Sequence, residues 1–438
     1  SGVLELIIDE GPLSQIRSVE FIGASSFSQQ ELAKILNLRV NGPLRLEKVE
    51  ESLEKLQSYY RQSGYLEMRI LNKDEDLVQY NESQTQADIV FKIKEGPQIF
   101  VDTIEVEGNS FTKTDVILRE ISFEEGEILT PEKISTSQQR LNRLGIFSRV
   151  SIMTLEQNTP QSQRTVIITV GERDPGLIRF GVGLNNERDL TARGFFGLSY
   201  SNLFGTARAI SGRLELRSNI ADINYLEHRL TAGYLEPFLL NTRTRGRINI
   251  TRSDQVFDTK QFEGEQLVQI ITSNRINFLL ERELGEHLQV SWSVWSIDSR
   301  TEREQNGGCF EPASFSACPP SPQRNQQIAT TGPTIELDFR DDAFVPTTGS
   351  YTRVSIDYSD PEIGSSDRIQ FLRGDGQYNR YFQLISPKWV WANSFRSGYV
   401  TNLSSRPDSG VPTSHAFFLG GTNTLRGFEF TEDSERVP

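Results

Sequence analysis

The residues of this chain that could perform acid–base or metal chemistry are few and lie far apart. His228, His287 and His415 fall in separate strands or loops, whereas a catalytic or metal site gathers such groups at one point. The neighbouring carboxylates Asp341 and Asp342 stand shortly before a proline and a glycine, which favours a solvated turn. We therefore predict no catalytic residue, no metal and no cofactor, and we expect that the protein is not an enzyme.

The two cysteines, Cys309 and Cys318, lie in one turn-rich stretch, 307-GGCFEPASFSACPPSP-322. With no other cysteine in the chain, this spacing predicts a local disulfide formed in an oxidising compartment. Two unrelated thiols are the alternative. A metal site is less favoured, because none of the histidines is a neighbour in the sequence.

An arginine near the C-terminus stands in an unusual setting, 418-FLGGTNTLRGFEF-430. Arg426 is flanked by Leu425 and Gly427, with Phe428 next. A guanidinium leaves water only where carboxylates accept its hydrogen bonds, and a glycine lets the backbone approach closely. The role of Arg426 therefore depends on the elements around it.

Composition excludes several classes of protein. The net charge of −13 and the pI near 5 argue against a nucleic-acid partner, which would call for a basic stripe. No apolar run is long enough for a transmembrane helix. The mean hydropathy of −0.43 resembles that of a soluble protein. Hydropathy averages miss a membrane β-barrel, however, because its strands alternate polar and apolar residues.

The first 175 residues contain an internal repeat. The stretch 16-IRSVEFIGASSFSQQELAKIL-36 matches 101-VDTIEVEGNSFTKTDVILREI-121, since in both a β-rich run ends at a glycine turn before a helix. A second amphipathic helix and alternating strands follow, so each copy reads β-α-α-β-β. Residues 1–12 end in the same Glu-Gly-Pro as residues 95–97. We therefore expect residues 1–12 to close an earlier copy.

From residue 176 onward the pattern changes to strands that have one apolar and one charged face. In 177-LIRFGVGLNN-186 the apolar residues Ile178, Phe180, Val182 and Leu184 fall on one face, and Arg179, Gly181, Gly183 and Asn185 fall on the other. The same alternation recurs at residues 208–217, 245–251 and 351–358. A half-buried strand of a soluble sandwich would alternate in the same way, so alternation alone leaves two fold classes open.

Three further features favour an outer-membrane β-barrel. Several strands exceed the usual length, such as residues 266–282. Connections after even-numbered strands are short, and long ones are expected after the fifth, seventh and eleventh. Aromatic residues cluster near strand ends, as in interfacial girdles: Trp389, Trp391, Tyr399, Tyr351 and Tyr358. We count eleven strands, and because bacterial barrels have an even number, we expect the chain to continue past Pro438.

These patterns divide the chain into four segments. They are the last strand of a preceding repeat (1–12), one complete repeat (13–97), a barrel-proximal repeat (98–175) and a partial outer-membrane barrel (176–438). The fold class is thus α+β repeats followed by an all-β antiparallel transmembrane barrel.

This organisation resembles the BamA/TamA superfamily of outer-membrane β-barrel assembly proteins, in which POTRA repeats precede a sixteen-stranded barrel. The most specific matches come late in the barrel region. The motifs that carry the resemblance are 107-EGNS-110, 116-VILREI-121, 140-RLNRLGIFSRV-150, Gly181-Val-Gly183, 193-RGFFGLSYSNLFGTA-207, 233-GYLEPFL-239, 338-DFRDDAFVPTTGSY-351 and 419-LGGTNTLRGF-428.

The resemblance implies roles for several residues. Leu425, Arg426, Gly427 and Phe428 would form the loop motif that folds into the lumen, where Arg426 pairs with carboxylates of later strands. The first barrel strand would form one side of a lateral gate, with Arg179, Phe180, Gly181, Val182 and Gly183 at the seam. Glycines weaken a strand, which suits a seam that opens, although a narrowed lumen would need the same glycines for room.

The POTRA repeats are expected to offer strand edges to client or partner chains by β-augmentation. The candidate edges are residues 148–155, with Arg149, Val150, Ser151 and Ile152, and residues 65–72, with Met68 and Ile70. The alternative is that these strands are internal or covered.

The function implied by the resemblance is assembly of outer-membrane proteins in a Gram-negative bacterium, with the POTRA domains in the periplasm. Expected partners are unfolded outer-membrane clients, the lipid bilayer with lipopolysaccharide, and periplasmic accessory proteins or lipoproteins. A TamA-like module and a two-partner secretion transporter pore are the alternatives. The second is less favoured, because those proteins carry two POTRA domains and residues 1–12 predict a further one.

Overall fold

The computed structural model describes the chain as two compact units, Ser1–Arg173 and Asp174–Pro438. The described residues are 13–417 except 37, 74–75, 186–189, 221–225, 263–264, 307–322, 387 and 408. The strand expected at residues 1–12, both cysteines and the Leu425–Phe428 motif lie outside this range, so those expectations stay predictions. Among the described helices, none combines the length and apolar composition needed to cross a membrane.

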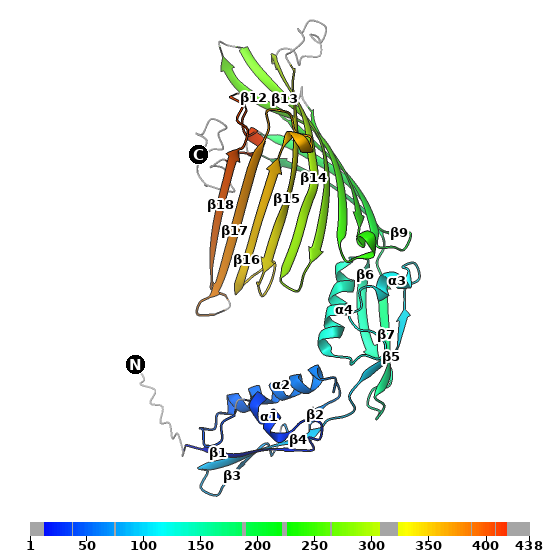
Figure 1. The fold of residues 1–438 in the computed structure, drawn as a ribbon, viewed down its shortest axis with the longest axis vertical. Helices are drawn as coiled ribbons and strands as arrows, with labels where there is room; N and C mark the ends of the chain where they lie inside the picture. The colour runs from blue at the N-terminus through cyan, green and yellow to red at the C-terminus, as the bar shows by residue number, and fades with distance from the viewer. Residues whose placement is uncertain are drawn as a thin grey trace, which may run out of the picture. The chain divides into compact units, whose positions relative to one another are not determined.

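The first half of unit 1 is a small sheet covered by two helices (Figure 1). Its central strand β4 pairs in parallel with β1 and antiparallel with β2 and β3. The strand expected at residues 65–72 shrinks to the two-residue β2, and β3 is an addition that the sequence did not indicate. The elements are β1(Gln15–Ile22), α1(Gln29–Leu36), α2(Leu46–Gln62), β2(Arg69–Ile70), β3(Val78–Tyr80) and β4(Gln86–Lys94).

The second half of unit 1 repeats this plan with a three-stranded sheet in the order β5-β7-β6. Pro131 occupies the first turn of α4, and the Thr130 side chain accepts a hydrogen bond from the Lys133 backbone N–H at 3.3 Å, so the helix begins where the sequence predicts. The elements are β5(Phe100–Glu107), α3(Thr114–Leu118), α4(Pro131–Arg143), β6(Phe147–Thr154) and β7(Gln163–Glu172).

Each repeat closes its glycine turn with a carboxylate from its last strand. Glu95 accepts hydrogen bonds from the backbone N–H and hydroxyl groups of Ser25 and Ser26 and from the Tyr60 hydroxyl. Burial alone would raise the pKa of Glu95, but these donors outweigh it and lower the pKa to about 2. Glu172 accepts equivalent bonds from Ser110, Phe111 and Thr112. The two carboxylates therefore lock the same turn in both copies.

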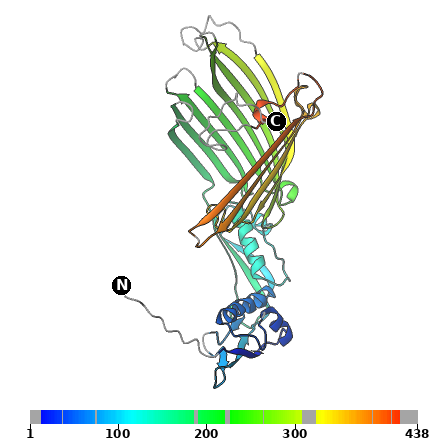
Figure 2. The same cartoon turned by 90° about the vertical axis from the view of Figure 1, so that its left-hand side faces the viewer.

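The described residues of unit 2 form one antiparallel sheet of eleven strands in sequential order, with β8 and β18 as its two edges. Figures 1 and 2 show the sheet curled along its width. The eleven strands agree with the number predicted from the sequence. They are β8(Gly176–Asn185), β9(Thr191–Leu203), β10(Arg208–Asn219), β11(Leu226–Glu236), β12(Arg245–Phe262), β13(Glu265–Glu283), β14(Leu288–Asn306), β15(Gln323–Asp338), β16(Gly349–Ser359), β17(Phe371–Gln383) and β18(Val390–Asn402).

The connections of the sheet differ from the prediction at one point. A long loop was expected after the fifth strand, but β12 runs to Phe262 and β13 begins at Glu265. The polar residues of this region extend both strands rather than forming a loop. The five connections after even-numbered strands lie together at the end of the sheet where Gly176 begins β8.

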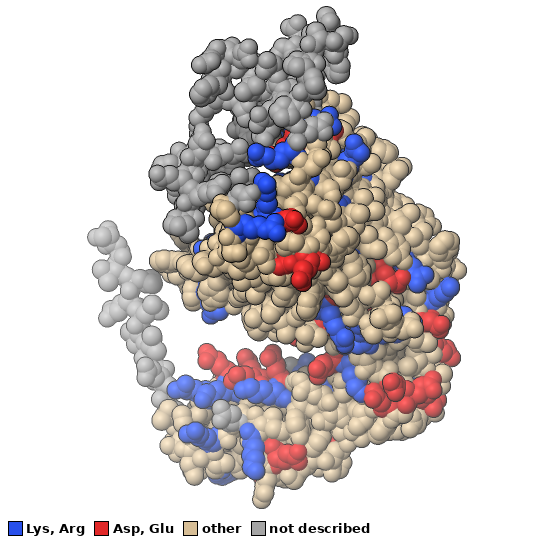
Figure 3. Space-filling view, turned by 45° about the horizontal axis from the view of Figure 1, so that its top comes forward, with Lys and Arg blue, Asp and Glu red and all other residues tan. Residues whose placement is uncertain are grey.

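The register assigns each side chain in the sheet to one of two faces, because directly opposed residues of neighbouring strands share a face. The inner face is polar, and one of its rows is Gly181, Phe195, Glu215, Arg229, Ser253, Ser273 and Arg300. The outer face carries large exposed apolar side chains, including Phe180, Val182, Leu198, Leu214 and Leu230. Figure 3 shows charges of both signs crowded over unit 1 and wide uncharged areas over the sheet.

Candidate functional site

The edge strand β8 is the first part of the candidate site. It pairs with β9 over its full length, and within the described residues nothing pairs with its other side. Phe180 and Val182 on its outer face are 80% and 94% exposed. Arg179, on the inner face, is also exposed. The apolar outer side of β8 suits contact with lipid, where backbone N–H and C=O groups must be paired with another strand.

The two glycines of this strand are not equivalent. A Cβ atom at Gly181 would lie 2.5 Å from the Phe195 ring, whereas one at Gly183 would meet nothing within 4 Å. The Phe195 ring in turn lies under the Arg213 guanidinium, 4.6 Å from its carbon atom. Gly181 therefore makes room for an aromatic ring of the inner wall, and Gly183 leaves an open position at the edge.

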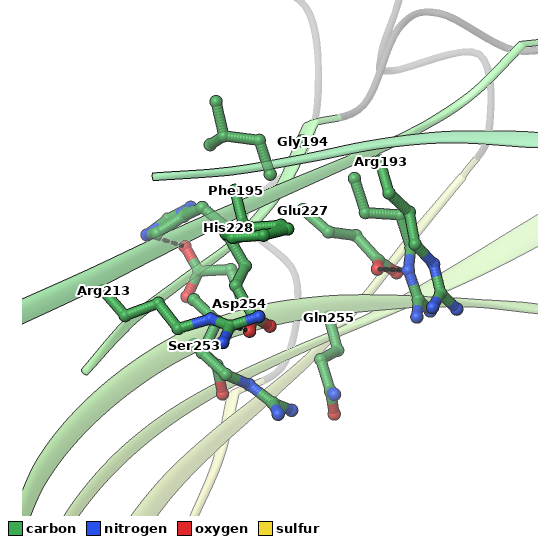
Figure 4. Close-up of a pocket in the computed structure, with 13 residues that line it drawn as sticks. Arg193, Gly194, Phe195, Arg213, Glu227, His228, Ser253, Asp254 and Gln255 are labelled. Carbon is green, nitrogen blue, oxygen red and sulfur yellow. Dashed lines mark ion pairs between the residues drawn. The ribbon is translucent and has the colours of Figure 1, made fainter. Parts of the chain in front are cut away.

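A charged cavity of about 260 Å³ adjoins this ring, between strands β9 and β12 (Figure 4). Arg213 forms an ion pair with Glu215 at 2.6 Å, and Arg217 lies 3.7 Å from Glu227. The Glu227 carboxylate also accepts a hydrogen bond from the Val256 backbone N–H at 3.0 Å. Paired charges of this kind keep the inner wall polar and wettable.

The most buried charge of unit 2 lies further along the inner face. Asp298 is 3% exposed and accepts hydrogen bonds from the Ser273 hydroxyl at 2.5 Å and from Arg275 and Arg300 at 2.8 and 2.9 Å. This cluster joins β13 to β14 through charge-assisted hydrogen bonds.

The segment after β18 packs against the inner face, through the short helix η4(Thr413–His415). The His415 ring packs 5.1 Å from the ring of Phe371 in β17, and the Arg373 guanidinium lies 4.6 Å from the Phe417 ring centre. Burial, reinforced by nearby arginines, lowers the pKa of His415 to about 4. The chain thus lies along the inner wall just before the Leu425–Phe428 motif, which is outside the described residues.

In unit 1, β6 forms an edge of its sheet, with β7 as its partner. Its residues Arg149, Val150 and Ser151 are exposed or half-buried, and Ile152 is buried. The exposed Met153 and the neighbouring Leu155 extend the accessible apolar surface beside this edge.

The second candidate edge, β2, has only two residues, and Met68 and Ile70 point into the core, where both are buried. Next to it, Glu67 bonds Arg164 at 2.9 Å and accepts from the Asn158 backbone N–H at 2.6 Å. These contacts tie β2 to the second repeat, so β2 offers a poorer template than β6.

The histidines and the Asp341–Asp342 pair, which were considered as catalytic or metal-binding candidates, do not form a common site in the structure. His228 lies 3.6 Å from Asp254 on the outer face, and His287 contacts the Asp338 carbonyl at 2.7 Å. Asp341 accepts hydrogen bonds from Thr347 and Thr348 and belongs to a turn, as predicted. Within the described part of the chain, no three His, Cys, Asp or Glu side chains form a group that could hold a metal ion.

Sequence reasoning missed part of the site. The contact between Gly181, Phe195 and Arg213 depends on three strands, and no local pattern indicates it. Trp292 and Trp295 both face outward, although they are three residues apart, because the register shifts between Phe278 and Leu279. A strict alternation would have placed one of them inside.

Two β-α-α-β-β repeats followed by a curled sheet with an apolar outer face define a POTRA-containing outer-membrane β-barrel protein. A model of the Omp85 superfamily domain matches residues 202–436, more than half of the chain. A POTRA model, described as a surface antigen variable number repeat, matches residues 14–96 and 99–173. The chain belongs to the Omp85 superfamily. Its sheet region lies in the outer membrane and its POTRA domains in the periplasm.

Curated relatives support the same family. The chain is similar to the outer membrane protein assembly factor BamA of Nitratidesulfovibrio vulgaris, with 22% identity over all of this chain and 51% of the relative. It is also similar to BamA of Neorickettsia risticii, with 22% identity over 91% of this chain and 49% of the relative. The chain thus spans about half the length of these relatives.

Solved structures share the fold. BamA from Haemophilus ducreyi lacking POTRA domains 1–3 superposes with a TM-score of 0.63 at 20% identity, covering 96% of this chain and 76% of that one. CdiB from Escherichia coli gives a TM-score of 0.53 at 16% identity, covering 96% of this chain and 73% of that one. At these identities the likeness concerns the fold alone.

Proposed function

We propose that the protein is an outer-membrane protein assembly factor that inserts unfolded β-barrel clients through a lateral gate at β8. The observation that supports this proposal is the weak packing of the first strand, β8, in a sheet whose outer face is apolar. A Cβ atom at Gly183 would meet nothing within 4 Å, so this stretch of the strand contributes little side-chain packing to its pairing. A seam held mainly by backbone hydrogen bonds can exchange them for those of an incoming strand.

The mechanism is non-covalent. A client strand pairs with β8 by β-augmentation, gains backbone hydrogen bonds, and places alternate side chains toward lipid and toward the polar interior. The next client strand then pairs with the client strand that is already bound to β8. Each added strand therefore provides a new edge for the strand that follows it. No covalent step is needed, and we assign the protein no enzymatic activity.

The POTRA domains deliver the client. Of the two candidate edges, β6 is the better docking strand, because it is eight residues long and adjoins the exposed Met153 and Leu155. Arg149 and its neighbours would pair through their backbones, which explains how clients of unrelated sequence can bind. Lipopolysaccharide and accessory lipoproteins belong to the same proposal as partners of the assembled protein.

Valine substitutions at glycines test the gate. Gly183→Val adds a β-branched side chain at a position of β8 where there is free space. It should strengthen the pairing between β8 and the strand that lies beside it at the closed gate. A stabilisation of about 1 kcal/mol reduces gate opening about fivefold. We expect slower assembly of outer-membrane proteins in cells that depend on the variant, measured as the amount of folded, heat-modifiable client.

Gly212→Val is the matched control, because Gly212 lies on β10, which is paired on both sides, and a Cβ there also meets nothing within 4 Å. It should leave client assembly unchanged. Gly181→Val is a different change, since it displaces the Phe195 ring. If both variants fold and clients assemble at the same rate with Gly183→Val and with Gly212→Val, β8 does not act as the gate.

The alternatives are a TamA-like translocation and assembly module and the pore of a two-partner secretion transporter, and the charged inner wall also suits such a pore. Ion pairs such as Arg213–Glu215 keep that wall wettable whichever function it serves. Conductance of the protein in planar bilayers separates the two functions. A steady open pore that passes an unfolded substrate without inserting it would favour the transporter.

A further inference from the structure

The short turns at the periplasmic end of the sheet share a feature that the gate does not use. Each carries a large apolar side chain at its tip, and all are more than half exposed, with Phe344 at 94% and Ile385 at 95%. We call this set the apolar rim: Phe204, Leu240, Leu284, Phe344 and Ile385. The five tips belong to five separate turns, so one local sequence does not explain them.

All five turns lie at the same end of the sheet, as Figures 1 and 2 show. They connect β9 to β10, β11 to β12, β13 to β14, β15 to β16 and β17 to β18. The β8 strand begins at this end, directly after the POTRA repeats. The rim therefore faces the periplasmic side.

Unusual backbone angles and hydrogen bonds fix the conformation of several of these turns. Phe204 and Leu240 have positive φ angles of 54° and 52°, a conformation that bulky side chains rarely adopt. Asn202 accepts a hydrogen bond from the Ala207 backbone N–H at 2.8 Å and so fixes the first turn. In the β15–β16 turn, the Asp342 carboxylate accepts from the backbone N–H groups of Phe344 and Val345 at 2.7 and 2.8 Å. Strained turns that project apolar tips indicate a surrounding other than water.

On β17 the rim continues the membrane-facing surface, whereas on β13 the exposed Arg282 lies on the outer face between Leu280 and Leu284. Below Phe382 on the outer face of β17, the apolar surface runs through Leu384 and Ile385 to Trp389. On β12 the outer row has only Ile248 and Ile250 before Arg252. Two residues along a strand span about 7 Å, far short of an apolar band about 25 Å tall. The turn tip Leu240 lengthens the band at the place where the strand leaves it short.

We propose that the apolar rim is embedded in the periplasmic leaflet of the outer membrane, with phospholipid acyl chains around the five tips. The short turns then lie inside the lipid, at the headgroup boundary, instead of in the periplasm. The apolar rim sets the depth of the sheet in the bilayer. This role does not depend on the lateral gate at β8, so the inference does not rest on the proposed assembly mechanism.

Spin labels at the tips test the inference. Phe204→Cys, Leu240→Cys, Phe344→Cys and Ile385→Cys are labelled with a nitroxide in a protein that also carries Cys309→Ser and Cys318→Ser. The intact protein is reconstituted in phosphatidylethanolamine and phosphatidylglycerol vesicles. Power saturation then compares collisions with oxygen, which concentrates in lipid, and with a water-soluble nickel chelate.

Val182→Cys on the outer face is the lipid control, and Glu54→Cys on the exposed side of α2 is the water control. We expect oxygen to dominate at all four tips, as at Val182, with nickel accessibility several-fold below that at Glu54. Tips that behave like Glu54 would overturn the proposal, and so would tips shielded from both reagents, because that result means a protein partner covers them. The four labelled sites lie in separate turns. If one variant misfolds, the accessibility of the other three sites still tests the proposal.

Discussion

The two units of the molecule differ in where most of their apolar side chains lie. In unit 1, Leu32, Leu56 and Phe91 are fully buried between helices and sheet. In unit 2, Phe180 and Val182 on the outer face are 80% and 94% exposed, and the inner face buries the carboxylate of Asp298 as well as a small apolar cluster that contains Phe371. Unit 1 thus has an apolar core, whereas unit 2 has a largely polar inner face and an apolar outer face.

This difference shows that an alternating pattern of polar and apolar residues does not by itself say whether the apolar face of a strand is covered by protein or by lipid. Strand β4 of unit 1 and strand β8 of unit 2 both alternate, but Ile89 of β4 is covered by helices and Val182 of β8 is not. Helical segments between the strands provide the cover in unit 1. Among the described residues of unit 2, no α-helix lies between the strands to cover the apolar face, which therefore suits contact with lipid.

The largest expected effect comes from the buried carboxylate of unit 2. Asp298→Ala removes the shared partner of Arg275 and Arg300, and breaking a buried ion pair in this way costs about 3–5 kcal/mol. We expect the folded sheet to convert to the unfolded form at a clearly lower temperature, measured by heat-modifiable migration in gels. Ser299→Ala, the neighbouring position on the exposed outer face, is the control and should change little. Equal behaviour of the two variants would refute a charge-based interior.

The next effect concerns the apolar core of unit 1. Leu56→Ala leaves a cavity under α2, because Leu56 is fully buried, and such changes cost about 2–5 kcal/mol. We expect a lower urea midpoint for the POTRA repeats. Leu198→Ala on the outer face of β9 leaves no cavity, since acyl chains fill the space, and it should leave the stability of the sheet nearly unchanged. A large loss for Leu198→Ala would contradict the contrast between the units.

The smallest effect concerns the carboxylate that locks the first POTRA turn. Glu95→Gln replaces charge-assisted hydrogen bonds with weaker ones and should cost about 1–3 kcal/mol. The folded pKa of Glu95 is about 2, below the ordinary value of 4.5. Its contribution is therefore complete above pH 4.5 and is lost as the pH falls toward 2. Urea unfolding between pH 6 and pH 2 should show a shallower decline for Glu95→Gln than for the parent, and parallel curves would contradict this assignment.

Much of the fold could be predicted from the sequence, because local patterns determine it. The start of α4 at Pro131 and the start of β8 near residue 176 depend on local punctuation and alternation. The shortness of β2 could not be predicted, since contacts of Glu67 with the second repeat shape that region. The length of β12 was also missed, because its polar half resembles a loop unless its pairing with β13 is known.

The candidate site was predictable in position but not in detail. The sequence indicated β8 and its glycines, and only the structure distinguishes Gly181, which accommodates Phe195, from Gly183, which is open. That distinction depends on a neighbouring strand and on Arg213 from a third. The turn tips were missed for another reason. An exposed Phe344 or Ile385 looks like an ordinary loop residue until five such turns are placed at one end of the sheet.

The most direct test of the account is a photo-crosslink from the β8 edge to a client during assembly. A photoreactive amino acid at Val182, on the edge strand, is compared with one at Ile250, which faces outward from the middle of the sheet on β12. The account predicts adducts between position 182 and strands of newly made outer-membrane proteins, and none from position 250. Adducts of equal yield at both positions, or none at 182 while clients assemble normally, would contradict it.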